Sequence, residues 1–394
     1  MTFPTLKTQY DQYILPTYAR FPVAFVRGEG SRLYDTDGKE YIDFASGIGV
    51  CSVGHAHPQW TAALAAQAAQ LTHVSNLYYS EPGAHLAEKL CALSGLRGGV
   101  FFSNSGAEAN EGAIKVARKY SASRYGPNRA VIVTLEGSFH GRTLTTLAAT
   151  GQPSFHKHFN PLTSGFRHVP PGDIGALESQ PDDVCAVMLE PVQGEGGVWP
   201  LDAGYVKQVE TLCRERDWLL IADEVQTGIG RTGQWFGFQT LGITPDVATF
   251  AKGIAGGLPM GGFLVGEKLG TVLEPGDHAT TFGGGPLCCA AALATLDILE
   301  PVLPSIQEKG ARLRACIESM GIPSVGGTRG LGLMIGISIK EGHPRDINQT
   351  LLQAGLVGLT AGTDALRFLP PLIIKDQDID QGLARFERVL RTKK

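Results

Sequence analysis

The sequence predicts an α/β protein built on a mainly parallel, doubly wound sheet, and three observations lead to this fold class. Short apolar runs alternate with helical patterns through the central part of the 394 residues. Several runs lack polar and apolar alternation, as expected of strands buried on both faces of a parallel sheet. The chain is also too long for one small core, so a large domain accompanied by a smaller one is expected.

The core elements are predicted in order along residues 55–290, which we assign to the large domain. Strands are expected at the apolar runs, which are residues 99–103, 130–135, 184–189, 218–222, 247–251 and 262–265. The clearest helices by apolar spacing are residues 106–120 and 204–216. This alternation is typical of strands joined by crossover helices.

Both ends of the chain differ in pattern from the core. Residues 22–44 alternate polar and apolar side chains between glycine-containing turns, which predicts a small antiparallel sheet. The C-terminal part mixes helices with short strands around residues 333–338. We therefore assign residues 1–54 and 291–394 to one smaller α+β domain packed on the core.

Composition and charge favour a small-molecule partner over nucleic acid or a membrane. The net charge is −4, and lysines and arginines are scattered rather than gathered in a basic stripe. No apolar segment approaches the roughly 18 residues that span a bilayer, and residues 1–20 lack the apolar region of a secretory signal. The seven cysteines are an odd number, which does not fit a framework of paired disulfides and favours reduced thiols. A cytoplasmic location is expected.

Two motifs that suggest nucleotide binding fail on their context. Gly228–Gly233 matches the G-x-G-x-x-G pattern, but residues 223–226 separate it from the preceding strand and no helical pattern follows. The strand end Asp223–Glu224 looks like the magnesium-binding strand of a P-loop ATPase, yet no glycine–lysine pair supplies the phosphate-binding loop. The paired histidines lack cysteine or acid partners at ligand spacing, so no metal site is expected.

An acid and a lysine end two predicted strands and suit one particular cofactor. Asp223 and Lys252 are far enough apart for a crossover that returns to the same sheet edge, where ligands bind in open α/β sheets. Pyridoxal phosphate requires a lysine for covalent attachment and a carboxylate against its pyridinium nitrogen. Each residue alone has an ordinary explanation, a capping acid or a solvated lysine, so the pair needs support from elsewhere.

A helix start and an aromatic side chain add that support. Ser105–Ala107 opens the helix after the strand at residues 99–103, so that backbone N–H groups and the positive helix end face a phosphate at the same edge. Phe139 and Arg142 follow the strand at residues 130–135 and offer a stacking ring beside a cation. Taken singly, the first is also an ordinary capped helix and Phe139 an ordinary core residue.

Several segments, in the same order, resemble the class III (subgroup III, ornithine-type) pyridoxal phosphate-dependent aminotransferases. They are Ser103–Asn110, Ser138–Thr143, Glu190–Gly197, Ile221–Gly228, Phe250–Gly253 and Thr281–Gly284. The resemblance extends from about Tyr18 to the C-terminus. It implies fold type I of these enzymes, in which a large domain with a seven-stranded, mainly parallel sheet flanked by helices carries a smaller α+β domain made from both chain ends.

The resemblance assigns cofactor contacts to the residues that match the family's motifs. Lys252 would hold the cofactor covalently and move a proton, and Asp223 would pair with the ring nitrogen. Thr281 would reach the phosphate in the neighbouring subunit, which implies a homodimer. The other expected contacts, to the phosphate, the ring faces or the ring hydroxyl, are Ser105, Gly106, Ala107, Phe139, Glu224, Val225 and Gln226.

Substrate specificity is expected from arginines, because a guanidinium binds a carboxylate with two hydrogen bonds. By resemblance, Arg142 would bind the carboxylate of the amino donor and Arg367 that of glutamate or 2-oxoglutarate. Glu195 would pair with Arg367 while the donor is bound, so that one site accepts two substrates in turn. A plain buried salt bridge is the ordinary alternative for this pair.

The resemblance implies transfer of the terminal amino group of N2-acetyl-L-ornithine to 2-oxoglutarate, in arginine biosynthesis. Ornithine, succinylornithine, succinyldiaminopimelate and 4-aminobutyrate are alternative donors. An aminomutase of the same fold would need no external oxo acid, and the Glu195–Arg367 pair favours exchange between two substrates instead. Thr280, Cys51 and Gly285 depart from the family's pattern at positions around the substrate mouth, which leaves the donor open; Thr280 replaces a serine that contacts substrate.

Overall fold

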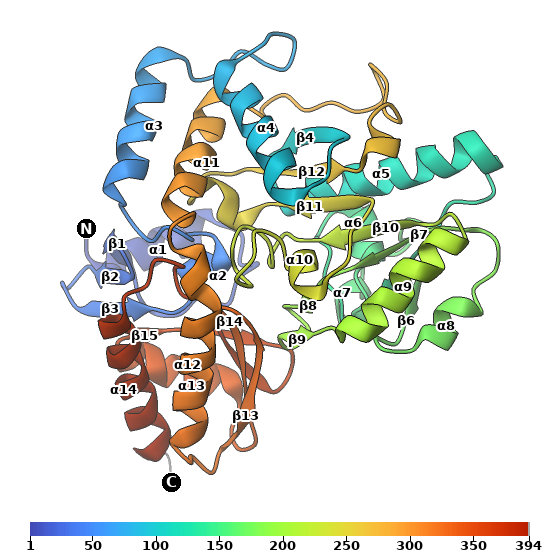
Figure 1. The fold of residues 1–394 in the computed structure, drawn as a ribbon. Helices are drawn as coiled ribbons and strands as arrows, with labels where there is room; N and C mark the ends of the chain where they lie inside the picture. The colour runs from blue at the N-terminus through green and yellow to red at the C-terminus, as the bar shows by residue number, and fades with distance from the viewer. Residues whose placement is uncertain (393–394) are drawn as a thin grey trace.

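The computed structural model describes residues 1–392, and a seven-stranded sheet forms the centre of this described region (Figure 1). The strands lie in the order β4, β12, β11, β10, β7, β5 and β6. Their bounds are β4 Gly99–Ser103, β5 Val131–Leu135, β6 Phe166–Val169, β7 Val184–Leu189, β10 Leu219–Asp223, β11 Val247–Phe250 and β12 Gly261–Val265. The predicted α/β fold class is confirmed.

Strand directions bring the candidate acid and lysine to one edge of the sheet. β10 is parallel to β7 and to β11, and β5 is parallel to β7 and to β6. β12 instead runs antiparallel to both β11 and β4. Asp223 pairs with Thr249 across β10 and β11, so the strand ends that carry Asp223 and precede Lys252 lie side by side.

Helices cover both faces of the central sheet. Successive side chains of a strand point to opposite sides, so each strand contributes to two apolar clusters. Ile221 and Val247 belong to an apolar cluster with residues of α5, whereas Leu220 and Ala248 belong to a cluster with residues of α9. The helices of this region are α3 Pro58–Gln70, α4 Glu81–Ser94, α5 Gly106–Tyr125, α6 Leu144–Ala149, α7 Pro153–His156, α8 Ile174–Glu178, α9 Ala203–Glu215, α10 Gly237–Leu241 and α11 Pro286–Leu299.

A second sheet joins the two ends of the chain. β1, β2 and β3 form the antiparallel pairs predicted for residues 22–44, and the C-terminal strand β15 pairs in parallel with β3. The bounds are β1 Phe25–Glu29, β2 Arg32–Asp35, β3 Glu40–Asp43 and β15 Leu356–Val357. Both chain ends therefore contribute to one smaller α+β unit, as predicted.

A third, antiparallel sheet belongs to the C-terminal part, and its strands follow the order β13, β14, β17 and β16. Their bounds are β13 Val325–Leu331, β14 Met334–Ile339, β16 Leu359–Ala361 and β17 Ala365–Phe368. The remaining elements are α1 Phe3–Tyr13, α2 Ser46–Gly49, α12 Ile306–Ser319, α13 Pro344–Gln353, α14 Asp376–Thr392, the 3-10 turns η1 Lys252–Ala255, η2 Glu267–Leu269 and η3 Leu303–Ser305, and the hairpin β8 Val192–Gln193 with β9 Trp199–Pro200. The domain limits at residues 54/55 and 290/291 stay predictions, and the second falls within α11.

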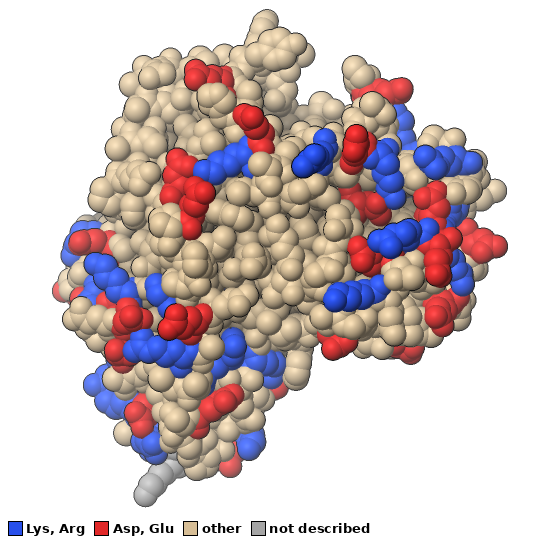
Figure 2. All heavy atoms as spheres, in the orientation of Figure 1, with Lys and Arg blue, Asp and Glu red and all other residues tan. Residues whose placement is uncertain are grey.

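Neither the surface in Figure 2 nor the helix lengths of the described region mark a site for nucleic acid or a membrane span. Side chains of both charges are interspersed on the face in Figure 2, and no continuous basic stripe crosses that face. Within residues 1–392, no single helix is long and apolar enough to cross a membrane. α11 and the segment Leu303–Ser319 pass that test only together, and they are bent by 57°.

Candidate active site

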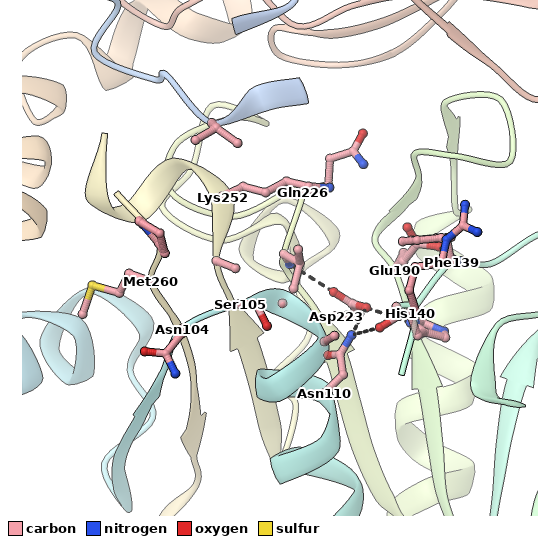
Figure 3. Close-up of a pocket in the computed structure, with 18 of the residues that line it drawn as sticks. Asn104, Ser105, Asn110, Phe139, His140, Glu190, Asp223, Gln226, Lys252 and Met260 are labelled. Atoms are coloured by element: carbon pink, nitrogen blue, oxygen red, sulfur yellow. Dashed lines mark hydrogen bonds and ion pairs between the residues drawn. The ribbon is translucent and has the colours of Figure 1, made fainter. Parts of the chain in front are cut away.

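A cavity of about 420 Å³ opens at the carboxyl edge of the central sheet (Figure 3). The ends of β10 and β11, the start of α5 and the segments after β5 and β7 all contribute to its wall. Sequence-predicted residues that line it are Ser105, Gly106, Ala107, Phe139, Arg142, Asp223, Val225, Gln226 and Lys252. Residues from distant parts of the chain are thus brought together as expected.

Lys252 begins η1, and one residue separates it from the end of β11. Its φ of 44° lies in the left-handed region, which is unfavourable for any residue with a Cβ and must be held by its surroundings. The Ser52 hydroxyl contributes by donating to Gly253 O at 2.7 Å. Burial lowers the pKa of Lys252, and the charge of Arg367 lowers it further, while nearby carboxylates act in the opposite direction. A lysine with a lowered pKa is suited to nucleophilic attack and proton transfer.

Asp223 is buried at the end of β10, with hydrogen-bond donors at both carboxylate oxygens. Its Oδ1 accepts the Val225 N–H at 3.0 Å and the Thr249 hydroxyl at 3.4 Å. Its Oδ2 lies 2.7 Å from both Asn110 Nδ2 and His140 Nδ1. The direction of the carboxylate is therefore fixed by the protein alone.

The start of α5 supplies backbone donors beside the acid and the lysine. Ser105 is the N-cap residue, and its hydroxyl accepts the Glu108 N–H at 3.2 Å. Glu108 in turn accepts the Asn104 N–H at 2.7 Å. The N–H groups of Gly106 and Ala107 belong to the first turn, where a helix offers no internal partner, and both residues line the cavity. This 20-residue helix therefore presents an anion-binding end.

Val225 and Phe139 form apolar parts of the cavity wall. A Cβ on Gly106 would lie 2.7 Å from Val225 Cγ1, so the helix start and this valine are already in contact. The Phe139 ring packs edge-on against Phe155, with centroids 5.8 Å apart. Arg142 places its guanidinium 4.2 Å from the Phe155 ring centroid. These contacts order the aromatic part of the wall and the arginine beside it.

Glu195 and Arg367 form an ion pair next to the cavity. Arg367 Nη1 lies 2.6 Å from Glu195 Oε1, and Arg367 is 3% exposed. Gln226 accepts from Arg367 at 3.0 Å and donates to Glu195 at 3.4 Å. Burial opposes ionisation of Glu195, but the charge and hydrogen bond of Arg367 hold its pKa below the usual range. Gln226 connects this pair to the cavity, which it lines.

Glu190 lines the cavity from the end of β7. Its carboxylate accepts the Phe139 N–H at 3.0 Å and the Gly194 N–H at 3.4 Å. Burial raises the pKa of Glu190 to about 7, with His140 lowering it and Asp223 raising it. This acid therefore ties the aromatic wall to the loop that leads to Glu195.

Glu224 does not line the cavity, and its expected contact with the cofactor stays a prediction. Its carboxylate accepts the N–H groups of Gly237 and Phe238 at 2.8 and 2.6 Å, and the Thr227 hydroxyl at 2.5 Å. Because successive side chains at a strand end point to opposite sides, Glu224 faces the start of α10 while Asp223 faces the cavity.

Two neighbouring threonines differ in their distance from the site. Thr280 accepts a hydrogen bond from Asn104 Nδ2 at 3.2 Å and so adjoins a residue of the cavity wall. Thr281 is exposed and does not line the cavity formed by residues 1–392 of a single chain. Its expected contact with a neighbouring subunit stays a prediction.

The residues present fit pyridoxal phosphate. Lys252 supplies an amine with a lowered pKa, Asp223 a fixed carboxylate, and the start of α5 unpaired backbone donors for a phosphate. Gly106 matters to this fit, since a side chain there would push Val225 toward the space that the ring requires. Lys252 and Asp223 would hold the ring at two points, and Gly106 and Ala107 would hold the phosphate.

Sequence reasoning missed several residues that the structure places in the site, among them three with polar side chains. Asn110, His140 and Glu190 all line the cavity, and each lies inside a segment that carries the family resemblance. Position offered a signal for two of them. Glu190 directly follows the buried strand β7, and Asn110 lies one helical turn after Gly106 on α5.

Comparisons with known proteins agree with this geometry. The acetylornithine aminotransferase of Haemophilus ducreyi is 50% identical over 394 residues, which cover 99% of each chain. The structure of N-acetylornithine aminotransferase from Stenotrophomonas maltophilia is 37% identical with a TM-score of 0.85, covering 97% of this chain and 98% of that one. The ornithine aminotransferase of Toxoplasma gondii, with pyridoxal phosphate partially occupying its active site, is 32% identical with a TM-score of 0.94, covering 99% and 94%.

A family model extends the agreement to nearly the whole chain. Residues 13–390 match the model described as aminotransferase class-III. The matched region includes the lysine, the acid, the helix start and the ion pair described above. The chain therefore belongs to the class-III aminotransferases, and its cofactor is pyridoxal phosphate.

Proposed function

We propose that this enzyme transfers the terminal amino group of N2-acetyl-L-ornithine to 2-oxoglutarate, giving N-acetyl-L-glutamate 5-semialdehyde and L-glutamate. The observation that carries the substrate assignment is the 50% identity to an acetylornithine aminotransferase over 99% of both chains. The Glu195–Arg367 pair beside the lysine cavity supports exchange between two carboxylate substrates. The proposal includes a role in arginine biosynthesis in the cytoplasm.

The wall of the cavity would hold the cofactor at its ends and faces. Bound pyridoxal phosphate withdraws electrons from the substrate carbon that carries the amine. Asp223 would accept the hydrogen bond of the ring nitrogen, and the N–H groups of Gly106 and Ala107 would bind the phosphate. Val225 and Phe139 would pack on the two faces of the ring and exclude water from it.

Lys252 would carry the proton. Its lowered pKa favours the uncharged amine, so Nζ would be able to accept a proton from the substrate carbon that bears the terminal amine and to release it again during turnover. The backbone at η1 limits where Nζ can lie, because Lys252 has a left-handed φ and the next residue, Gly253, is held by the hydrogen bond from Ser52. Gln226 at the cavity wall would bind the ring hydroxyl.

Arg142, Glu195 and Arg367 would let one site accept two substrates. While the donor is bound, Arg142 binds its carboxylate and Glu195 neutralises Arg367. When 2-oxoglutarate enters, Glu195 turns away and Arg367 binds the carboxylate that the donor lacks at that position. Thr280 adjoins the cavity wall through Asn104 and would contact the substrate there.

A substrate panel tests the donor assignment. Purified enzyme is assayed with 2-oxoglutarate and, side by side, acetylornithine, ornithine and 4-aminobutyrate. The highest kcat/KM is expected for acetylornithine. Ornithine is the second candidate, because the Toxoplasma gondii ornithine aminotransferase matches this fold with a TM-score of 0.94. Equal or better activity on ornithine or 4-aminobutyrate would overturn the proposal, and turnover without an oxo acid would indicate an aminomutase.

We also propose that the enzyme is a homodimer in which Thr281 contacts the neighbouring active site. Leu77, Tyr79 and Phe282 are apolar and 86%, 106% and 68% exposed, as expected of a surface that another chain covers. The loops that carry these residues lie side by side, since Asn76 Nδ2 donates a hydrogen bond of 2.8 Å to Gly283 O. Sedimentation should give a dimer for the wild type and a monomer for Phe282→Glu; a monomeric wild type would contradict the proposal.

A further inference from the structure

We propose that His140 and Asn110 are positioning residues that hold the Asp223 carboxylate toward the cofactor's ring nitrogen, and that the His140 proton lies on Nδ1. The inference rests on the proposed role of Asp223 in cofactor binding. It assigns a task to two buried polar side chains that do not themselves reach the reacting atoms.

The geometry brings both side chains to the same carboxylate oxygen from different parts of the fold. Asn110 belongs to α5 and His140 to the segment after β5, and each nitrogen lies 2.7 Å from Asp223 Oδ2 (Figure 3). Asn110 Nδ2 also donates to His140 O at 2.7 Å, so the two residues are linked to each other. The His140 backbone is fixed in turn by its N–H, which donates to Thr150 Oγ1 at 2.9 Å.

The remaining polar atoms of the two side chains show that Asp223 accounts for their burial. Within residues 1–392, His140 Nε2 and Asn110 Oδ1 are buried and have no hydrogen-bond partner. The His140 side chain is 0% exposed. A buried polar atom without a partner costs free energy, so the contacts that these side chains do make must outweigh that cost. Those contacts converge on Asp223.

The partners also assign the proton on the imidazole. An ionised carboxylate accepts hydrogen bonds and cannot donate one, so His140 Nδ1 must carry the proton that it shares with Asp223. Nε2 faces no acceptor that would favour a proton there. Asp223 and Glu190 are the acids whose charges act on this region from β10 and β7, and His168 is the neighbouring base on β6. Asp223 thus gains a directed donor on Oδ2, which holds the carboxylate toward the ring nitrogen.

Three substitutions at His140 separate positioning from structure. Asparagine places an amide donor near the position of Nδ1, glutamine places one near Nε2, and leucine supplies none. The dissociation constant of pyridoxal phosphate for the apoenzyme and the visible spectrum of the holoenzyme are measured for each. His140→Leu and His140→Gln should weaken cofactor binding by about tenfold or more, the usual effect of losing a hydrogen bond to a charged group. His140→Asn should restore binding to within about threefold of wild type.

Two further variants complete the design. Asn110→Leu should weaken cofactor binding in the same direction as His140→Leu. His168→Asn is the matched control, because His168 Nδ1 bonds the Thr134 hydroxyl on the sheet and the residue does not line the cavity. It should leave the cofactor dissociation constant and the visible spectrum unchanged. Thermal unfolding of each apoenzyme tests whether a loss of binding merely follows from loss of structure.

Several outcomes would overturn the inference. Wild-type cofactor binding and spectrum in His140→Leu would do so, as would equal losses in the asparagine and glutamine variants. A ¹⁵N spectrum of the holoenzyme with the His140 proton on Nε2 would refute the assigned tautomer. Asp223→Asn tests the proposed cofactor contact of Asp223 separately from the positioning roles of His140 and Asn110. If that variant binds the cofactor like wild type, the proposed role of Asp223 fails together with the inference.

Discussion

A missing methyl group at Gly106 lets the start of α5 meet Val225 at the cavity wall. Gly106→Ala would place a Cβ 2.7 Å from Val225 Cγ1, so one of the two must move. We expect the affinity for pyridoxal phosphate to fall by about tenfold or more, because overpacking displaces either the phosphate donors or the ring contact. The measurement is the cofactor dissociation constant of the apoenzyme.

Gly175→Ala is the control for this substitution. Gly175 is an exposed helix residue of α8, and its added Cβ would come no closer than 3.4 Å to Asp173 Oδ1. This variant should bind the cofactor like wild type. Equal affinity of the Gly106→Ala enzyme would show that the contact with Val225 relaxes without cost.

Replacing Arg367 separates the two half-reactions. Arg367→Gln removes the guanidinium whose Nη1 lies 2.6 Å from Glu195 Oε1. The same guanidinium would bind the carboxylate of 2-oxoglutarate. We expect kcat/KM for 2-oxoglutarate to fall by about 100-fold, as for loss of charged hydrogen bonds, with a smaller effect on the donor half-reaction. Rapid mixing of the enzyme with each substrate alone measures the halves. Equal losses in both would indicate a structural salt bridge instead.

At the level of single residues, the sequence was informative where chemistry restricts the choice. Asp223 and Lys252 could be placed at one sheet edge because each ends a buried run. The direction of the Glu224 side chain, toward Gly237 and away from the cavity, could not be predicted because adjacency in sequence does not reveal which side chain turns to the cavity. His140 and Asn110 were missed because an Asn or His in a motif acquires its meaning only from the partner it reaches, and that partner is distant in the chain.

Among the elements, the buried strands and the edge strand β4 were predictable, whereas the opposite edge strand, β6, was not. The strands β7 and β10 are buried throughout and form unbroken apolar runs. β6 lies at the sheet edge, and Arg167 and His168 interrupt its apolar residues, so the sequence pattern gave no sign of it. α5 extends to Tyr125, beyond the predicted end at residue 120, because residues 122–125 are exposed and carry no apolar pattern that would reveal a helix.

The connection between β10 and α10 contains a buried acid with an unusual ionisation. Burial raises the pKa of Glu224 to about 7, although hydrogen bonds from Thr227, Gly237 and Phe238 act in the opposite direction. The unfolded chain has the ordinary value of 4.5, so it releases this proton first as the pH rises. The stabilisation from Glu224 is therefore complete below pH 4.5 and is lost as the pH rises through about 7.

Glu224→Gln should reduce this dependence on pH. A glutamine has no proton to lose, so the stability of the variant relative to wild type should increase between pH 4.5 and 8. Urea unfolding at several pH values measures the difference. Glu190 titrates in the same range and leaves part of the slope in place. A stability difference that is independent of pH would contradict the assignment.

Across the whole molecule, a buried arginine joins the central part to the C-terminal part. Arg231 is 2% exposed, and its Nη1 donates to Leu333 O at 3.0 Å and Pro370 O at 2.6 Å. Arg231→Met keeps much of the volume but leaves two buried carbonyls without this donor. We expect a loss of about 1–3 kcal/mol in the free energy of unfolding, measured with urea.

Arg312→Met is the control for a surface charge. Arg312 pairs with Asp376 and Asp380, whose side chains are 66% and 59% exposed, so its loss should cost less than about 1 kcal/mol. Similar losses of unfolding free energy in the two variants would mean that Arg231 stabilises the fold no more than a surface ion pair does.

The antiparallel strand β12 has a consequence for how substrate choice can change. β11 ends at Phe250 and the antiparallel strand β12 begins at Gly261, so the ten residues between the two strands leave the sheet and return to the same edge. Lys252 lies near the start of this connecting segment, and Leu258 and Met260 lie near its end. All three residues line the cavity. Mutations of Leu258 or Met260 that reshape the cavity mouth should therefore also shift the backbone at Lys252. Selectivity gained there should trade against turnover, whereas Arg142, on a separate segment, is free to vary independently during evolution.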